Sequence, residues 1–253
     1  MRIIIIILFI FVTLFSDSQI LILNNSFTVN NYTSERNFNS LNIECKQQID
    51  SSSIYHNILL NKDDTLKGSY TNYGTNILIV ANKFSEGGYQ WGGISGVCIP
   101  LYYNGKLIRN YTKGDKTHCV GFTLSVAFVI AINRNLFKGK YFDSIHKFSS
   151  EWYSEGGING KLCVDAIKNL GIGIEVTLSE AKSGDFCQIW RTNGSGHSVI
   201  FINHIINDND KIIGIKYRSS QKSTNGIGDR EEYYSDTGKG KMDKKYTYFG
   251  RLN

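Results

Sequence analysis

One stretch of the sequence constrains the fold more than any other. "CVGFTLSVAFVIAIN", residues 119–133, is an almost unbroken apolar run that follows the polar segment "GDKTH". Its apolar residues recur at helical spacing, and one face of the expected helix carries Val120, Leu124, Ala127, Phe128 and Ala131. Thr117 is the predicted N-cap. We therefore expect a helix that is anchored in the core, while its N-terminus, near Cys119, faces a cleft.

The first residues of the chain indicate export. "MRIIIIILFIFVTLF" has one positive charge and then an apolar segment too short to span a bilayer comfortably. We predict a cleaved signal peptide over residues 1–19, a secreted or periplasmic protein, and no stable membrane insertion after cleavage. An uncleaved membrane anchor is the alternative, because no small-x-small cleavage site stands out.

The remaining chain divides by composition. Residues 20–75 are rich in Asn, Ser and Thr and have weak apolar periodicity, which predicts a polar N-terminal extension. Residues 76–253 are expected to form one folded domain. The net charge of +6 favours anionic surroundings such as a cell wall. The positive residues are scattered and form no basic helix or Arg/aromatic ladder, so nucleic acid is not an expected partner.

The cysteine count points to an unpaired thiol. The chain has five cysteines, at positions 45, 98, 119, 163 and 187, so disulfides within one chain leave at least one free. Two disulfides among the other four would leave Cys119 free, but the sequence does not fix the pairing. A structural protein in which Cys119 is itself disulfide-bonded is another reading. Neither the cysteines nor the five histidines show a zinc-ligand pattern, so no metal is expected.

Helix-like segments precede strand-like ones along the chain. Helical patterns occur at residues 77–84, from 119, at about 144–153 and at about 159–169, and Asn104-Gly105 marks a hairpin between the first two. Strand patterns follow in "GIGIEVTL", on both sides of the turn in "DFCQIWRTNGSGHSVIFINHII", and in "KIIGIKYRSSQ". This order predicts an α+β fold with helices packed on one antiparallel sheet.

Cys119 is the candidate nucleophile. The unpaired N–H groups and the dipole of a helix N-terminus stabilise a thiolate. His197 follows Gly194 and Gly196 at the start of a strand and is the candidate base, whereas His118 is the weaker one because adjacent side chains usually point apart. A third group has to orient the imidazole, and the next strand offers Gln221 or Ser219 for that role.

Four motifs resemble those of the NlpC/P60 cysteine-peptidase superfamily, which includes the CHAP amidases. They are "NILIVANKFSEGGYQWGG", "HCVGF" at a helix start, "SEAKSGDFCQIW" and "GSGHSVIFI". The resemblance implies a papain-like fold in which a nucleophile-bearing helix packs on the sheet that bears the base. It also implies that Cys119 is the nucleophile, that His197 is the base, and that Tyr89 lines the site. Asp185 matches a structural turn residue, and the third polar position falls within "YRSSQ".

The chain departs from the commonest family pattern beside the nucleophile. It has His118-Cys119-Val120 where Asp-Cys-Ser is usual, and the spacings around Cys119 are longer. The resemblance is therefore to a divergent amidase branch. It implies a secreted cysteine amidase or endopeptidase without cofactors, acting on peptidoglycan stem peptides or cross-links, or on another peptide, through a thioester. The predicted site comprises the catalytic residues Cys119, His197 and Gln221 and the substrate-binding residues Tyr89, Trp91 and His118.

The alternative is a catalytically inactive secreted module on the same fold, which binds a cell-wall peptide or glycan without cutting it. The sequence leaves open which amide bond is cleaved and whether the protein is oligomeric.

Overall fold

The computed structural model describes residues 73–84, 87–111, 114, 116–153 and 160–253. All of them belong to the second of the two units into which the chain divides, residues 42–253. The predicted signal peptide (1–19) and nearly all of the predicted extension (20–75) lie outside the described residues. No helix in the described part of the chain is long and apolar enough to cross a membrane.

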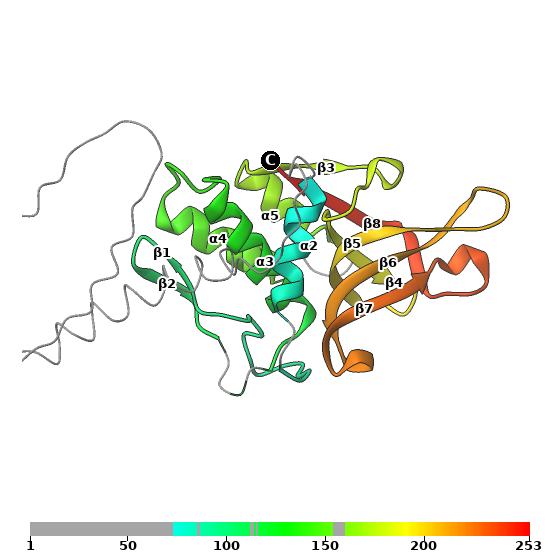
Figure 1. Cartoon of the computed structure of the whole chain (residues 1–253), viewed down its shortest axis with the longest axis horizontal. Helices are drawn as coiled ribbons and strands as arrows, with labels where there is room; N and C mark the ends of the chain where they lie inside the picture. Colours follow the sequence, from blue (N-terminus) through cyan, green and yellow to red (C-terminus); the bar gives the residue numbers. More distant parts are fainter. Residues whose placement is uncertain (1–72, 85–86, 112–113, 115, 154–159) are drawn as a thin grey trace, which may run out of the picture. The chain divides into compact units, whose positions relative to one another are not determined.

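The helices lie together on one side of a sheet (Figure 1). They are α2 (Tyr73–Lys83), α3 (Cys119–Asn133), α4 (Phe142–Trp152) and α5 (Cys163–Asn169). Helix α3 contacts α2 and α4 as well as strands of the sheet, and every residue from Cys119 to Ala131 is buried. The predicted core helix is therefore confirmed, but it is buried on all sides rather than on one face.

Six antiparallel strands form the sheet, in the order β3-β8-β4-β5-β6-β7. Their bounds are β3 Gly173–Val176, β4 Phe186–Arg191, β5 Gly196–Ile206, β6 Ile212–Gln221, β7 Gly226–Tyr233 and β8 Met242–Leu252. The predicted α+β class with helices on an antiparallel sheet is confirmed. Two strands, β7 and β8, follow the last strand that the sequence pattern predicts.

Alternation along the strands divides the core between the two faces of the sheet. Phe186 and Ile200 pack with the helices, whereas Cys187 and Val199 belong to a second apolar cluster on the other face. Successive side chains of a strand point to opposite faces, so neighbouring residues of β4 and β5 reach different clusters. Both faces are covered along β4 and along the first half of β5, which explains the continuous burial there, whereas the second half of β5 is partly exposed.

The predicted hairpin is present between α2 and α3. It consists of β1 (Leu101–Tyr103) and β2 (Lys106–Arg109), joined by Asn104 and Gly105. Both turn residues have positive φ, 49° and 73°, as a two-residue type I′ turn requires.

Two helix boundaries differ from the prediction by several residues, and α2 begins at Tyr73, earlier than the pattern at residues 77–84 indicates. Helix α5 begins at Cys163 rather than near Asn159. Leu162, directly before it, has a φ of 42°, and a non-glycine residue in this left-handed region cannot continue a right-handed helix. The helical pattern in the sequence does not reveal this break.

Candidate active site

Cys119 is the first residue of α3, and the residue before it caps the helix. His118 has extended backbone angles, φ −139° and ψ 170°, and its Nδ1 accepts the backbone N–H of Gly121 at 3.3 Å. Nδ1 therefore carries no proton, and Nε2–H can donate to the carbonyl of Ile94 at 3.4 Å. Burial lowers the pKa of His118, which keeps this capping imidazole neutral.

The predicted N-cap, Thr117, is one residue too early. Its hydroxyl instead shares a hydrogen bond with the hydroxyl of Ser220, at 2.8 Å. Threonine is the more common N-cap residue, but here the cap is set by the backbone of His118 and by the space available for its ring.

Two glycines bring a loop directly onto the first turn of α3. A Cβ on Gly121 would lie 2.1 Å from the carbonyl carbon of Gly96, and a Cβ on Gly96 would lie 2.3 Å from the His118 ring. Gly96 also has a φ of +65°. The loop is fixed further by the Tyr153 hydroxyl, which donates to the carbonyl of Ser95. Trp91, earlier in the same loop, contacts the His118 ring edge-on, with 5.2 Å between the ring centroids.

The Cys119 thiol is buried against the start of β5. Its side chain is 5% exposed, and burial is the main reason why its pKa is raised. The backbone N–H of Ser198, the N–H groups at the helix start and the guanidinium of Arg191 oppose this effect but do not outweigh it. Cys119 is therefore protonated at neutral pH when the site is unoccupied.

His197 and Gln221 form a hydrogen bond between adjacent strands. Nε2 of His197, on β5, lies 3.1 Å from Oε1 of Gln221, the last residue of β6. The amide nitrogen of Gln221 donates to the Thr224 hydroxyl at 2.9 Å and to the Gly228 carbonyl at 3.3 Å, so the amide oxygen must face the imidazole. His197 Nε2 then carries the proton and Nδ1 is unprotonated.

Ser219, the other candidate for this position, has a different partner. Its hydroxyl donates to the carbonyl of Ser198 at 2.7 Å. Of the two residues that the sequence leaves open, the geometry therefore favours Gln221 as the group that orients His197.

The imidazole of His197 is neutral as well. Burial is the largest cause that lowers its pKa, to about 4, and the positive charge of Arg191 acts in the same direction. Arg191 is held by Glu232, with Nη2–Oε2 at 2.8 Å, and the Tyr217 hydroxyl donates to the same carboxylate at 2.9 Å. The Tyr217 ring packs edge-on against His197, with 5.6 Å between the centroids.

Cys119 and His197 line the same cavity, whose volume is about 410 Å³. We call it the Cys119 cavity. Its wall comes from the loop (Trp91, Ile94), the start of α3 (His118, Cys119), Tyr153, Leu162, and the facing ends of β4 and β5 (Gln188, Trp190, His197, Ser198). Its lining therefore includes the Cys119 thiol and His197, whose Nε2 is hydrogen-bonded to Gln221. No hydrogen bond joins the Cys119 thiol to the His197 imidazole in the described part of the chain, and alternation along β5 puts the His197 side chain on the same face as Val199, whereas Ile200 packs with the helices.

Two of the three predicted substrate-binding residues border this cavity. Trp91 is 66% exposed at its rim and His118 lies in its wall. Tyr89 is not among the residues that line this cavity, and its predicted role in substrate binding stays a prediction. A β-bridge joins Tyr89 to Thr117, and burial, together with the nearby Cys119, raises its pKa. It lies close to the helix start, because backbone hydrogen bonds join the residues on either side of it, Gly88 and Gln90, to Thr117.

Sequence reasoning missed several lining residues. Tyr153, Leu162 and the β4 residues Gln188 and Trp190 come from three places in the chain that the fold brings together. Gln188 did carry a signal, because it is the one amide side chain within the otherwise apolar strand "FCQIW".

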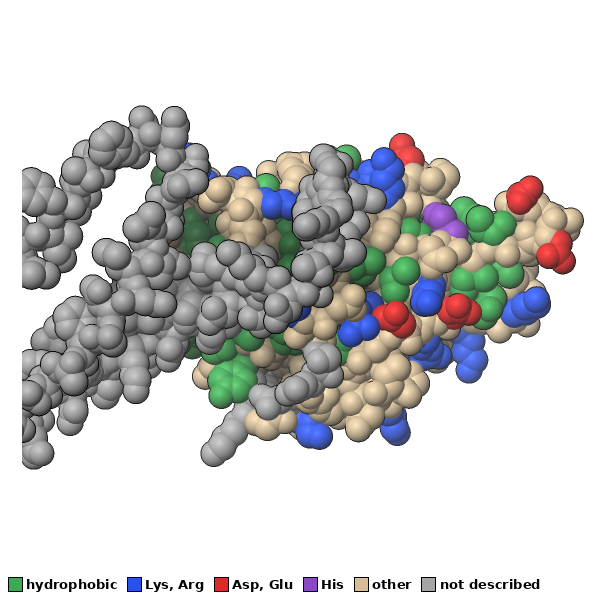
Figure 2. Space-filling view, viewed as in Figure 1, with side chains coloured by type: hydrophobic (Ala, Val, Ile, Leu, Met, Phe, Trp, Pro, Cys, Tyr) green, Lys and Arg blue, Asp and Glu red, His purple; other side chains and the backbone are tan. Residues whose placement is uncertain are grey.

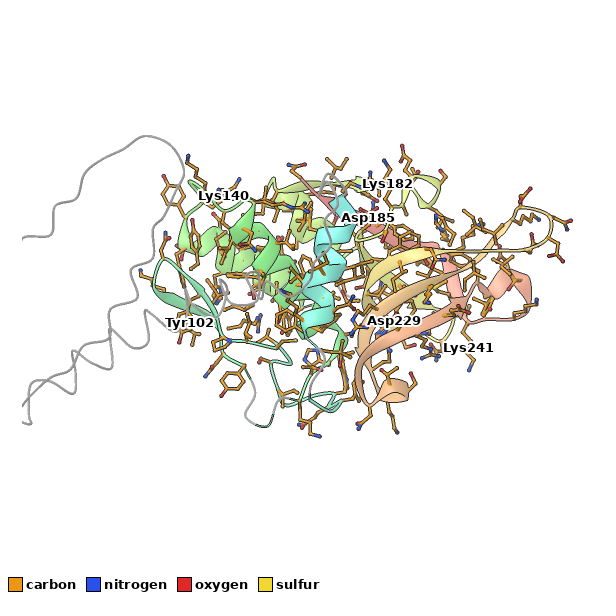
Figure 3. The ribbon with its side chains drawn as sticks, viewed as in Figure 1. Tyr102, Lys140, Lys182, Asp185, Asp229 and Lys241 are labelled. Atoms are coloured by element: carbon orange, nitrogen blue, oxygen red, sulfur yellow. The ribbon has the colours of Figure 1, made fainter. Side chains whose placement is uncertain are left out.

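Asp185 has a structural position, as the resemblance implied. It is fully buried and accepts two hydrogen bonds from Arg251 of β8, at 2.9 and 2.7 Å, and one from the backbone N–H of Lys182, at 2.7 Å. Figure 3 shows Asp185 and Lys182 close together, where the turn leads into β4. The carboxylate thus fixes this turn against the last strand of the sheet.

The four described cysteines are free thiols: Cys98, Cys119, Cys163 and Cys187. The two disulfides that would leave Cys119 as the odd cysteine are therefore not formed, because they would require at least three of these residues to be paired. Cys119 is also not disulfide-bonded, which removes the reading as a disulfide-stapled protein. Within the described ranges, no group of three or more His, Cys, Asp or Glu side chains could hold a metal ion.

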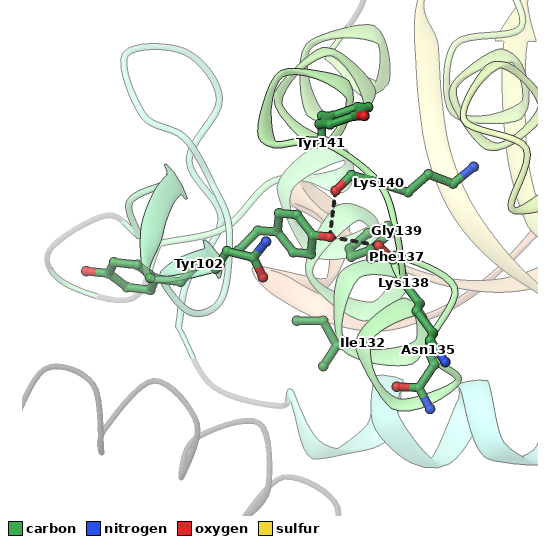
Figure 4. A pocket seen from close by; sticks show the side chains of 11 residues that line it. Tyr102, Ile132, Asn135, Phe137, Lys138, Gly139, Lys140 and Tyr141 are labelled. Carbon is green, nitrogen blue, oxygen red and sulfur yellow. Dashed lines mark hydrogen bonds between the residues drawn. The ribbon is translucent and has the colours of Figure 1, made fainter.

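A larger cavity, of about 680 Å³, lies beside the hairpin (Figure 4). The Tyr103 hydroxyl bonds there with the carbonyls of Phe137 and Lys140, at 2.8 and 2.9 Å. Its described lining contains no Cys, His, Asp or Glu, and its ionisable side chains are tyrosines and the lysines Lys138 and Lys140. The smaller Cys119 cavity is therefore the candidate site, since it alone of the two contains a nucleophile and a base.

Comparison of the chain with family models, with curated proteins and with solved structures found no match in any of the three.

Proposed function

We propose that the protein is a cysteine hydrolase that cleaves amide bonds, built on a papain-like arrangement as a divergent member of the NlpC/P60 superfamily. The observation that carries this proposal is the hydrogen bond from His197 to Gln221 at the cavity that Cys119 also lines. A glutamine that fixes one imidazole nitrogen leaves the other free to accept a proton. Cys119 is the thiol available in this cavity to supply that proton.

The reaction starts from the neutral pair. As the sulfur of Cys119 attacks the carbonyl carbon, Nδ1 of His197 takes the thiol proton. The imidazolium then protonates the leaving amine, the C–N bond breaks, and a thioester remains. His197 next removes a proton from water, which attacks the thioester, releases the acid and restores the thiol. A preformed ion pair is the other possible starting state, but burial raises the pKa of Cys119 and lowers that of His197.

The helix start supplies a donor for the oxyanion. Cys119 is the first residue of α3, so its backbone N–H has no acceptor within the helix. A donor directed at the developing negative charge typically contributes about 2.7–4 kcal/mol to transition-state stabilisation. The mechanism uses only groups of the chain.

We propose peptidoglycan stem peptides or cross-links as the substrate. The alternative substrate is another peptide. The signal-like N-terminus and the net charge of +6 are consistent with a secreted or periplasmic protein that works on an anionic cell wall. On the face shown in Figure 2, the visible Lys and Arg side chains are scattered among acidic and apolar ones rather than gathered in one patch. The net positive charge would therefore attract the whole protein to an anionic cell wall, rather than form a localised basic binding site.

Digestion of purified peptidoglycan tests the proposal. Wild-type protein, Cys119→Ala and a control, Cys98→Ala, are incubated with sacculi, and released fragments are identified by mass spectrometry. Cys98 is a suitable control because it is a free cysteine outside the cavity lining. New amine and carboxyl ends made by the wild type and the control, but not by Cys119→Ala, would support the proposal.

Two other outcomes would change it. Binding to sacculi without cleavage by any of the three proteins would favour the inactive cell-wall-binding module. Neither cleavage nor binding would exclude peptidoglycan as the substrate, and the same three proteins would then be compared on a library of peptides.

A further inference from the structure

An ion pair and a tyrosine share one face of the sheet with His197. Alternation along the strands, together with their register, puts four side chains on this face: Arg191 of β4, His197 of β5, Tyr217 of β6 and Glu232 of β7. It is the face of the second apolar cluster, to which Tyr217 belongs. A pair of opposite charges therefore lies on the same face as the proposed base.

The four side chains are joined by direct contacts. Nε and Nη2 of Arg191 donate to the two carboxylate oxygens of Glu232, at 2.5 and 2.8 Å. The Tyr217 hydroxyl donates to the same carboxylate at 2.9 Å, and the Tyr217 ring lies edge-on to the imidazole of His197, with 5.6 Å between the centroids. One tyrosine side chain thus bridges the ion pair and the imidazole.

Stability alone does not account for this ion pair. Only 16% of the Arg191 side chain and 8% of the Glu232 side chain are exposed. Removing two charges from water opposes folding, and apolar residues of the same volume often stabilise a fold as well or better. Solvent also screens such charges much less than it screens charges at the surface, so both act on a neighbouring imidazole.

The two charges act on His197 in opposite directions. Burial is the largest cause that lowers the pKa of His197, and the positive charge of Arg191 lowers it further. The hydrogen bond with Gln221 and the negative charge of Glu232 raise this pKa, whereas Arg230, also on β7, lowers it. Arg191 therefore disfavours the imidazolium, and Glu232 offsets part of that effect.

On the helix side, the Cys119 cavity presents titratable groups that are uncharged at neutral pH. Burial lowers the pKa of His118 and raises the pKa values of Cys119 and Tyr153. The charges that act on His197 therefore come from β4 and β7 rather than from the described lining of the cavity.

We propose that the Arg191–Glu232 pair sets the charge of the His197 side chain: Arg191 keeps the imidazole uncharged, and Glu232 limits this effect so that the ring can still accept a proton. An imidazole held in this way remains a base in mildly acidic surroundings, in which an ordinary histidine is protonated. The inference rests on the proposed role of His197 as the general base, and it makes Arg191 and Glu232 positioning residues of that site.

NMR titration of His197 tests the inference without requiring turnover. The protein is labelled with ¹⁵N-histidine, and the His197 signals are identified by their absence in His197→Gln. Arg191→Met should raise the midpoint of His197 from about pH 4 by about one pH unit or more, because the carboxylate of Glu232 is then unopposed. Glu232→Gln should lower the midpoint, and the double variant Arg191→Met/Glu232→Gln should lie between the two single variants.

A second ion pair between neighbouring strands is the matched control. Nη1 of Arg218, on β6, lies 2.8 Å from Oδ1 of Asp229, on β7. Arg218 directly follows Tyr217, so its side chain lies on the other face of the sheet. Arg218→Met should leave the midpoint of His197 unchanged.

The signs of the shifts separate an electrostatic role from a structural one. A pair that only supported the strands would not give opposite shifts, since losing either member breaks the same contacts. Equal midpoints in the wild type and Arg191→Met, or shifts of the same sign in the two single variants, would overturn the inference. Should Arg191→Met fail to fold, comparing Glu232→Gln with the double variant still isolates the effect of the Arg191 charge.

The pH dependence of peptidoglycan cleavage distinguishes this inference from the proposed function. The acidic limb of kcat/KM reports the free enzyme's base, so it should shift in each variant with the NMR midpoint. An acidic limb that stays in place while the NMR midpoint moves would overturn His197 as the base, and would leave the effect of the ion pair on its charge established. Unchanged NMR midpoints in an active enzyme would overturn the inference alone.

Discussion

Burial sets the protonation states of the proposed nucleophile and the proposed base. Cys119 and His197 are 5% and 7% exposed, and desolvation is the largest cause of the pKa change of each. It disfavours the charged form, so the thiol and the imidazole are both neutral in the unoccupied site. In the proposed mechanism His197 therefore acts as a general base on a thiol, rather than as the partner of a thiolate already formed.

The neutral thiol gives the first prediction. Alkylation of Cys119 by iodoacetamide should accelerate continuously from about pH 6 to about pH 10, because only the thiolate reacts and burial raises the pKa of Cys119. The modified peptide is quantified by mass spectrometry at each pH, with free N-acetylcysteine as the reference. A constant, fast rate between about pH 6 and pH 8 would instead indicate a thiolate–imidazolium pair.

The second prediction links His197 to stability. The pKa of the His197 imidazole is 6.5 in its ordinary environment and about 4 in the fold, so the unfolded chain binds this proton more readily. The stability that the neutral imidazole contributes is complete above pH 6.5 and is lost as the pH falls towards 4. Between pH 7 and pH 4.5 the wild type should lose about 2–3 kcal/mol more than His197→Gln, as measured by urea unfolding. Equal losses in the two proteins would show that His197 is solvated in the fold.

The start of α3 could be predicted only in part from the sequence. The apolar run predicted the helix, and its start to within one residue, because such a run has to be buried. The His118 cap was not predictable, since histidine is not a preferred N-cap and its ring needs the bare α-carbon of Gly96 beside it. Parity along β6 correctly placed Gln221, because period-2 alternation survives in a regular strand.

The close contact between Gly121 and the loop gives the third prediction. Alanine normally favours a helix by about 1 kcal/mol over glycine, but a Cβ here would lie 2.1 Å from the Gly96 carbonyl carbon. We expect Gly121→Ala to lower the free energy of unfolding by about 1–3 kcal/mol in urea titrations. Lys147→Ala on the exposed side of α4 is the control and should change it by less than about 0.5 kcal/mol. A stabilised Gly121→Ala would mean that the loop does not pack on α3.

At the scale of the whole molecule, the local sequence pattern did not predict which distant strands pair in the sheet. The predicted strands β3 to β6 are present, but nothing local indicates that β8 enters between β3 and β4. Tyr153 and Leu162 were missed for this reason, because each reaches the Cys119 cavity through packing between segments far apart in the chain. Local periodicity fixes the type of an element, whereas its neighbours depend on contacts far apart in the chain.

The fourth prediction concerns the ion pair that joins the start of β4 to β8. Asp185 is fully buried and held by both arms of Arg251, so Asp185→Asn leaves the guanidinium without its charge partner. The free energy of unfolding should fall by about 3 kcal/mol in chemical denaturation. The exposed pair of Asp229 with Arg218 is the matched control, and Asp229→Asn should cost less than about 1 kcal/mol. Similar effects in the two variants would contradict a special role for Asp185.

The position of β8 has a consequence for misfolding and aggregation. β3 and β4 are synthesised long before β8, yet in the finished sheet β8 separates them and pairs with both. Until residues 242–252 are available, each of the two earlier strands presents an open edge, and unpaired strand edges are templates for intermolecular pairing. A nascent chain that stalls before β8, or a protease that removes it, should therefore produce aggregates rather than a loosened monomer.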